Sequence, residues 1–164
     1  MELNLKEKQF IFGKVRITKY RAGTNEVVSQ SDWMDNLIVN NDGRGKNLIA
    51  QRLVGVNTYS LNVTHGELGT SIGTPTAADT ALGTPAARTT KALGSIGSTL
   101  NEAQLQFFWT DSQLANGTYY EFGTFVDGLS GTSTGQMFNH ILFSTPYTKA
   151  TGEDTTVEVD FTIS

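Results

Sequence analysis

TTVEVDFTIS, residues Thr155–Ser164, carries the clearest structural pattern of the sequence. Apolar and small residues alternate with polar ones along it, so that Thr155, Val157, Val159, Phe161 and Ile163 share one face and Thr156, Glu158, Asp160 and Thr162 share the other. A period of two residues is that of a β-strand, whose successive side chains point to opposite faces. We therefore expect this segment to be a strand docked on the core, and the protein to be built of strands.

Working outward, similar alternation predicts further strands at residues 10–20, 26–32, 59–64, 104–109, 119–126 and 137–143. The first two are expected to form a hairpin around the turn residues 21–25. One short helix is expected over KNLIAQRLV, residues 46–54, with the Asn and Asp side chains of residues 40–42 as its N-terminal cap. About seven or eight strands with one helix predict an all-β fold, a β-sandwich or jelly roll.

The segment Gly66–Thr90 interrupts this pattern, because it is rich in Gly, Thr, Ala and Pro and has neither the helical nor the strand period. A connection of this length is uncommon inside a compact domain unless it is functional or is ordered against a partner. We expect a long ordered loop, an arm or clasp on the β-domain.

Composition limits the domain organisation and the partners. The chain of 164 residues is long enough for one domain, which we expect over residues 10–164, preceded by an N-terminal arm, Met1–Gln9. The formal net charge of −4 and the scattered Lys and Arg residues disfavour nucleic acid as a partner. Residues 1–13 lack the apolar core of a signal peptide, and no segment approaches the length of a membrane span, so no membrane partner is expected.

Two patterns raise the possibility of an enzyme. GTSTG, residues 131–135, matches the G-x-S-x-G pattern of hydrolases, but the expected context is a hairpin loop rather than a strand followed by a helix. Glu121 is a candidate glycosidase acid, with Asp111 or Asp127 as the second carboxylate. The alternative, which we favour, is that Glu121 accepts backbone N–H bonds at a strand edge, and no enzymatic activity is expected.

Metal and cofactor sites have weak support. The chain has no cysteine, and its two histidines, His65 and His140, lack the spacing of metal ligands. We interpret His140 as a hydrogen-bonded core or interface histidine. A calcium site at Glu153, Asp154, Glu158 and Asp160 is the weaker alternative to a solvated strand face. We expect no cofactor and no metal.

Aromatic and basic residues suggest two further roles. Trp33, Trp109, Tyr119 and Tyr120 could line a sugar-binding surface, although core packing is the commoner fate of such residues. Arg52 and Arg88 each end a segment that is otherwise poor in charge. Because a guanidinium can donate to several carbonyl groups at once, we interpret both as clamps that hold a loop.

Several segments, taken in order, resemble a pattern found in small virion proteins of tailed bacteriophages. The matching segments are residues 33–41 leading into 47–50, residues 69–82 with Arg88, residues 121–125, and residues 149–163. The resemblance implies a jelly-roll-like β-fold and a structural or adhesive role without catalysis. The candidate structural and interface residues are Trp33, Asn36, Arg52, Arg88, Glu121, Phe125 and His140.

The sequence thus leads us to expect an accessory head protein that decorates or cements the capsid of a phage particle assembled in the host cytoplasm. Its partners would be the major capsid protein, or tail and collar proteins, and further copies of itself, as a homotrimer. The alternatives are a tail, collar, baseplate or fibre component, and an adhesion module that binds a receptor or carbohydrate.

Overall fold

Strand β11, Glu153–Ile163, is the central element of the fold. The computed structural model describes residues 11–164, and in it β11 pairs along one edge with β1, Ile11–Arg21, and along the other with β8, Glu102–Trp109. Val157, Val159 and Phe161 are buried, which confirms the expected alternation. Ile163, at the end of the same face, is 59% exposed and is not part of the core.

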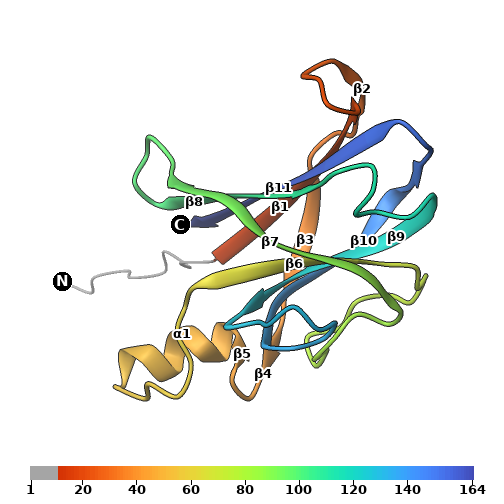
Figure 1. The fold of residues 1–164 in the computed structure, drawn as a ribbon. Coiled ribbons are helices and arrows are strands. Elements are labelled where there is room, and N and C mark those ends of the chain that lie inside the picture. Colours follow the sequence, from red (N-terminus) through yellow and green to blue (C-terminus); the bar gives the residue numbers. More distant parts are fainter. Residues whose placement is uncertain (1–10) are drawn as a thin grey trace.

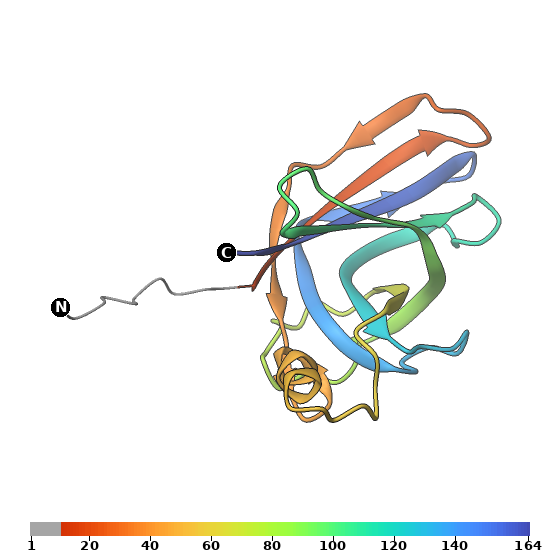
Figure 2. The same ribbon diagram turned by 90° about the vertical axis from the view of Figure 1, so that its left-hand side faces the viewer.

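The pairing of β11 with both β8 and β1 closes the sheet into an antiparallel barrel (Figures 1 and 2). Around the ring from β8 to β1, the other strands are β7 (Pro85–Ile96), β6 (Val63–Gly69), β9 (Gly117–Val126), β10 (Gln136–Lys149) and β3 (Met34–Ile38). Outside the ring, β2 (Val27–Gln30) pairs with β1, and β4 (Asn40–Asn41) pairs with β5 (Arg44–Gly45) ahead of helix α1 (Lys46–Leu53). The expected all-β class with one short helix is confirmed as a barrel or sandwich-like sheet.

Part of the ring has Greek-key order. Strands β6, β7 and β8 follow one another as neighbours, and β9 returns to pair with β6, which gives the spatial order β9-β6-β7-β8.

Among residues 11–164, no helix is long and apolar enough to span a membrane.

The barrel interior is filled with aromatic side chains. Phe138 and Phe161 meet edge to face, with ring centroids 5.0 Å apart. Trp109 and Tyr119 are buried as well, and the Tyr119 hydroxyl donates to the Ala115 carbonyl oxygen at 2.8 Å. These two aromatics therefore belong to the core rather than to a sugar-binding surface.

The predicted cap of the helix is wrong. Asn40 and Asn41 pair with Gly45 and Arg44 across a tight hairpin, and the helix begins after Gly45 with no side-chain cap. The first helical N–H, that of Lys46, donates instead to the carbonyl oxygen of Val39 at 2.9 Å. A backbone acceptor thus satisfies a donor for which a side chain was expected.

The predicted boundaries of the long loop are also wrong. The strand that was expected over residues 59–64 begins at Val63 and continues to Gly69, and β7 begins at Pro85, so the loop is confined to residues 70–84. Gly66 hides the strand period because it packs against the ring of Phe107, where an added Cβ would lie 2.6 Å from the ring. The expected arm, Met1–Gln9, lies outside the described residues.

Candidate functional site

The outer face of β6, β7, β9 and β10 carries four charged or titratable side chains that are almost fully buried. Glu67 lies opposite Arg88 in β7, while Glu121 and His140 lie on the adjoining strands β9 and β10. Glu67 and Glu121 are fully buried, and His140 is 4% exposed. Because burying an unpaired charge is costly, each of these groups requires partners within the protein.

His140 lies between two carboxylates. Its Nε2 atom is 2.9 Å from Oε2 of Glu121, and its Nδ1 atom is 2.6 Å from Oδ2 of Asp79, which belongs to the loop of residues 70–84. When both ring nitrogens face carboxylate oxygens, both must donate, and only the imidazolium has two donors. The geometry therefore favours a charged histidine.

The pKa shifts of this Asp79–His140–Glu121 triad all favour the charged forms: the pKa of His140 is raised, and the pKa values of Glu121 and Asp79 are lowered. Burial by itself would lower the pKa of His140, but hydrogen bonds to Glu121 and Asp79 outweigh it and raise the pKa. Burial would raise the pKa of Glu121, yet the bonds from His140 and from backbone N–H groups hold it below its usual value. For Asp79, burial is outweighed by bonds from Thr76 and His140, and the pKa is lowered.

Glu121 also holds both ends of the loop of residues 70–84. Its carboxylate accepts the backbone N–H of Ser71 at 3.2 Å, of Gly83 at 3.0 Å and of Thr84 at 2.9 Å. These bonds agree with the interpretation of Glu121 as an acceptor of backbone N–H groups. The loop is thus ordered against a buried side chain of its own chain, and this order needs no partner.

Arg88 performs a similar function for the second loop, residues 127–135. Its Nε donates to the carbonyl oxygen of Leu129 at 2.8 Å, and its Nη2 to that of Thr134 at 2.6 Å. The guanidinium lies 4.5 Å above the ring centre of the buried Phe125. Arg88 therefore has the contacts expected of a loop clamp, and a cation–π contact with Phe125 helps to hold its guanidinium in place.

Glu67 completes this second network. It lies 3.4 Å from Arg88 Nη1 and accepts the backbone N–H of Ser133 at 3.1 Å. Burial is the main cause that raises the pKa of Glu67 and lowers the pKa of Arg88. The fold therefore holds the Glu67–Arg88 pair in place although both charged groups lose their contact with water.

Arg52 differs from Arg88. It lies at the exposed end of α1, and within residues 11–164 its guanidinium donates to Oδ1 of Asn57 at 2.7 Å. This acceptor is a single side chain near Arg52 in sequence, so the described residues do not support the expected role of Arg52 as a clamp on loop carbonyls.

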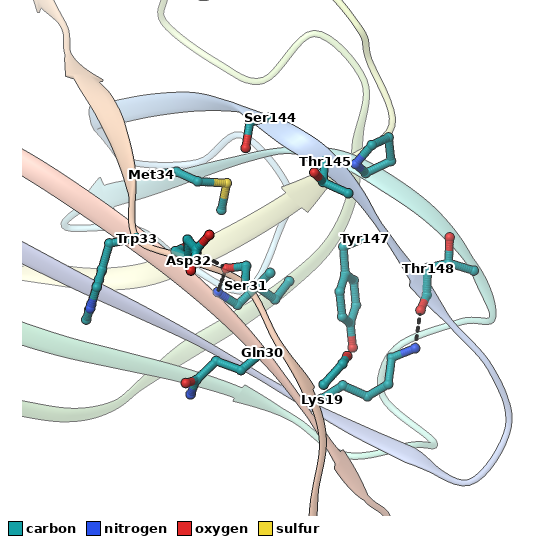
Figure 3. A pocket seen from close by; sticks show the side chains of 13 residues that line it. Lys19, Gln30, Ser31, Asp32, Trp33, Met34, Ser144, Thr145, Tyr147 and Thr148 are labelled. Carbon is teal, nitrogen blue, oxygen red and sulfur yellow. Dashed lines mark hydrogen bonds between the residues drawn. The ribbon is translucent and has the colours of Figure 1, made fainter.

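Trp33 and Asn36 lie away from both networks. Trp33 is 38% exposed beside an open pocket of about 520 Å³ between residues 29–34 and residues 144–148 (Figure 3). Figure 3 shows Lys19 donating to the carbonyl oxygen of Thr148 at the far side of this pocket, near Tyr147. The amide of Asn36 packs against Gly13, where an added Cβ would overlap it, and has no hydrogen-bond partner among residues 11–164.

The carboxylates considered for catalysis are not brought together. Asp111 pairs with Lys149, and Asp127 accepts bonds from Ser60, whereas the side-chain partner of Glu121 is His140. Ser133 lies in the loop between β9 and β10, so the strand-to-helix turn of a hydrolase elbow is missing at this position.

The acids considered for calcium have other partners. Glu153 pairs with Lys19 at 3.0 Å, and Glu158 with Arg16 at 2.8 Å. Asp154 accepts the backbone N–H groups of Gly23 and Asp111. In the described part of the chain, no group of three or more His, Cys, Asp or Glu side chains is arranged to hold a metal ion.

One end of the barrel carries an open apolar pocket of about 350 Å³, which we call the mouth. Its rim includes Ile11, Ile96, Leu100 and Ile163, from strand ends that are far apart in sequence. Sequence periodicity did not indicate it, because the pocket exists only where those ends converge.

The two loop-anchoring carboxylates Glu67 and Asp79 were also missed as site residues. The available signal was their isolation in a segment almost without charge, since an isolated carboxylate there has a specific partner in the fold. A comparison of the chain with protein-family models, curated proteins and solved structures found no match. Function is therefore argued from the geometry of the site and from the sequence pattern.

Proposed function

We propose that this chain is a non-enzymatic virion protein of a tailed phage, an accessory head protein that stabilises the particle through protein–protein contacts. The observation that supports this most directly is what the two anchored loops display. Ile72, in the loop of residues 70–84, is 74% exposed, and Leu129, in the loop of residues 127–135, is 70% exposed. Large apolar side chains on loops that are already ordered bind a partner with little further loss of conformational entropy.

The buried charges support a structural role for the same reason. The oxygens of Glu121 accept hydrogen bonds from His140 and from the backbone, and the donors of Arg88 reach loop carbonyls. Groups used in this way position loops and are not available to a substrate. The partners in this proposal are the major capsid protein and further copies of the chain in a homotrimer, within a particle assembled in the host cytoplasm.

The proposal includes the finer description of the barrel as a jelly roll. Along the chain, the pairs β1·β11, β3·β10, β6·β9 and β7·β8 are nested inside one another, as the hairpin pairs of a jelly roll are. A jelly roll contains two Greek keys, and the strand order β9-β6-β7-β8 corresponds to one of them. The remaining neighbours around the ring differ from the usual jelly-roll order.

Binding to particles that lack the protein tests the proposal. Ile72→Ser and Leu129→Ser should each weaken binding roughly tenfold or more, as expected when an apolar anchor is lost from an interface. Leu53→Ser is the matched control, because Leu53 is 82% exposed but lies on α1, outside the anchored loops. Binding equal to that of the wild type for both loop variants would overturn the proposal.

The pocket beside Trp33 favours a second candidate, an adhesion module that binds carbohydrate. Serine and threonine hydroxyls line this pocket next to an exposed indole, and sugars are bound by such hydroxyls and by stacking on aromatic rings. Glycan-array binding that Trp33→Ala abolishes would support this candidate. A tail, collar or baseplate location is the other alternative, and locating the protein in a map of the particle distinguishes it from the head.

A further inference from the structure

The mouth is an apolar surface with a fixed rim. Phe138 and Phe161 of the core form part of its lining, while Ile96 and Ile163 at its rim are 66% and 59% exposed. The rim is held by two bonds between Asn101 and Ile163. Asn101 Nδ2 donates to the Ile163 carbonyl oxygen at 2.7 Å, and the Ile163 N–H donates to the Asn101 carbonyl oxygen at 2.9 Å. A large exposed apolar patch of this kind marks an interaction site.

Leu100, also on the rim, is an unusual residue for its position. Its φ angle is 64°, in the left-handed region, and its side chain is 83% exposed. Gly or Asn would adopt this conformation at lower cost, and a polar residue would suit the exposure better. Neither the turn nor the core explains a leucine here, whereas an apolar contact at the mouth does.

The segment that precedes the described chain has the matching chemistry. Residues 1–10 read MELNLKEKQF, in which Met1, Leu3 and Leu5 alternate with Glu2 and Asn4. This alternation is that of an extended segment with one apolar face. The segment joins the structure at Ile11, whose side chain lines the mouth.

The sequence of this segment favours a neighbouring copy over its own mouth. Residues 5–10 contain no Gly, Pro, Asn or Asp, the residues that would mark a reversal of the chain directly before β1. Fully extended, residues 1–10 span up to about 33 Å, enough to reach an adjacent barrel.

Charged side chains at the mouth add a polar contact to the apolar one. Glu102 and Lys91 both line the mouth, and Lys91 Nζ donates to Oδ1 of Asn62 at 2.8 Å. Lys6 and Lys8 follow the apolar residues of the N-terminal segment and would place a positive charge within reach of Glu102.

We propose that the mouth of each copy binds residues 1–5, MELNL, of a neighbouring copy, with Leu3 and Leu5 against Ile96, Leu100 and Ile163. Arms exchanged in this way around a ring close a symmetric homo-oligomer. The inference deepens the homo-oligomer of the proposed function and rests on that part of it.

Disulfide trapping tests the exchange, because the native chain has no cysteine. One chain carries only Leu3→Cys, and a second chain with a larger tag carries only Ile96→Cys, so that a disulfide between them can form only between copies. Under mild oxidation, the mixed dimer should form several-fold faster than with a partner chain that carries Leu53→Cys, an exposed position on α1. In parallel, sedimentation should show an oligomer for the full chain and a monomer for residues 10–164.

Equal rates of trapping for the Ile96 and Leu53 positions would overturn the inference. A monomeric full chain, in which Leu3→Cys and Ile96→Cys on the same molecule link to each other, would overturn it too, by showing that each arm covers its own mouth. If the protein binds particles but no disulfide forms between copies, the exchange of N-terminal segments is rejected and the proposed virion function stands. If the disulfide forms between copies but the protein does not bind particles, the virion function is rejected and the exchange stands.

Discussion

The outer face of β6, β9 and β10 and the mouth of the barrel use their side chains in opposite ways. On the outer face, Glu67 and Glu121 are fully buried, and each is bonded to groups of the same chain. At the mouth, Ile96 and Ile163 are more than half exposed. The polar groups of the first region find their partners within one copy, whereas the second region exposes apolar side chains to solvent.

The difference separates residues whose contacts hold the structure together from exposed residues that contact a partner in our proposal. Removing a buried charge leaves its former partners without hydrogen bonds inside the protein, so the cost falls on stability. Removing an exposed apolar side chain changes stability little, so the cost falls on binding. The following variants test whether the two regions divide in this way.

The largest effect is expected at Glu121. Glu121→Ala leaves His140 and the N–H groups of Ser71, Gly83 and Thr84 without their acceptor, and should lower the free energy of unfolding by about 3–5 kcal/mol. Denaturant unfolding measures this loss. The matched control is Glu26→Ala, which removes an exposed ion pair with Arg21 and should leave the unfolding midpoint near that of the wild type. Similar midpoints for the two variants would mean that the triad does not stabilise the fold.

Two residues on one face of β11 allow a direct test of core against mouth, because one is buried and the other is exposed at the rim. Phe161→Ala empties a buried position and should cost about 3–5 kcal/mol. Ile163→Ala lies on the same face at the rim of the mouth and should change stability by less than about 0.5 kcal/mol. Unfolding midpoints of the two variants, measured in a chain of residues 10–164 that lacks the N-terminal segment, test this difference. A larger loss for Ile163 would place the rim within the core rather than at an interface.

A smaller effect is expected from pH. The pKa of His140 is raised on folding, so its contribution is complete below its ordinary pKa of 6.5 and is lost as the pH rises through the folded value. The pKa values of Glu121 and Asp79 are lowered from 4.5 and 3.8, so their contributions are complete above those values and are lost as the pH falls further. The triad should therefore contribute most between about pH 4.5 and 6.5.

Comparison with His140→Gln isolates the contribution of His140 to the free energy of unfolding. Other groups with raised pKa values, such as Asp160, titrate equally in both proteins and cancel in the comparison. The stability difference between wild type and variant, measured from pH 5 to pH 9, should shrink as the pH rises. A difference that is constant over this range would show that His140 is not charged in the folded state.

The smallest effect is expected at Asp160. Because burial and the nearby Glu102 carboxyl group raise its pKa to about 6, the ionised form at pH 7 is unfavourable in the folded protein. Asp160→Asn should therefore raise stability at pH 7, by less than about 1 kcal/mol, since solvent screens a partly exposed group. Thermal unfolding at pH 7 and pH 5 measures the gain, which should be smaller at pH 5. A loss of stability at pH 7 would show that the carboxylate has a favourable partner.

The strands were predictable where a regular period survives. β11 and β8 each bury alternate residues along a paired strand, and the alternation of Val157, Val159 and Phe161 is visible in the sequence itself. β6 was misplaced because it has glycines where the strand packs closely against other elements, at Phe107 and at Glu121. The neighbouring residues in the sequence do not show that such a glycine belongs to a strand, because the side chain that requires it is distant in the sequence.

The candidate site was predictable only in part. Arg88, Glu121 and His140 stood out as polar residues in unusual surroundings, whereas Asp79 and Glu67, whose signal was their isolation in a segment poor in charge, were missed as site residues. The strand class, the short helix and most strand positions could be read from the sequence, because they follow from the spacing of neighbouring residues along the backbone. The folded barrel was needed to see that Glu121 anchors the loop of residues 70–84, that Arg88 clamps the loop of residues 127–135, and that distant strand ends form the mouth. Those contacts join residues that have no common period and become neighbours only when the barrel closes.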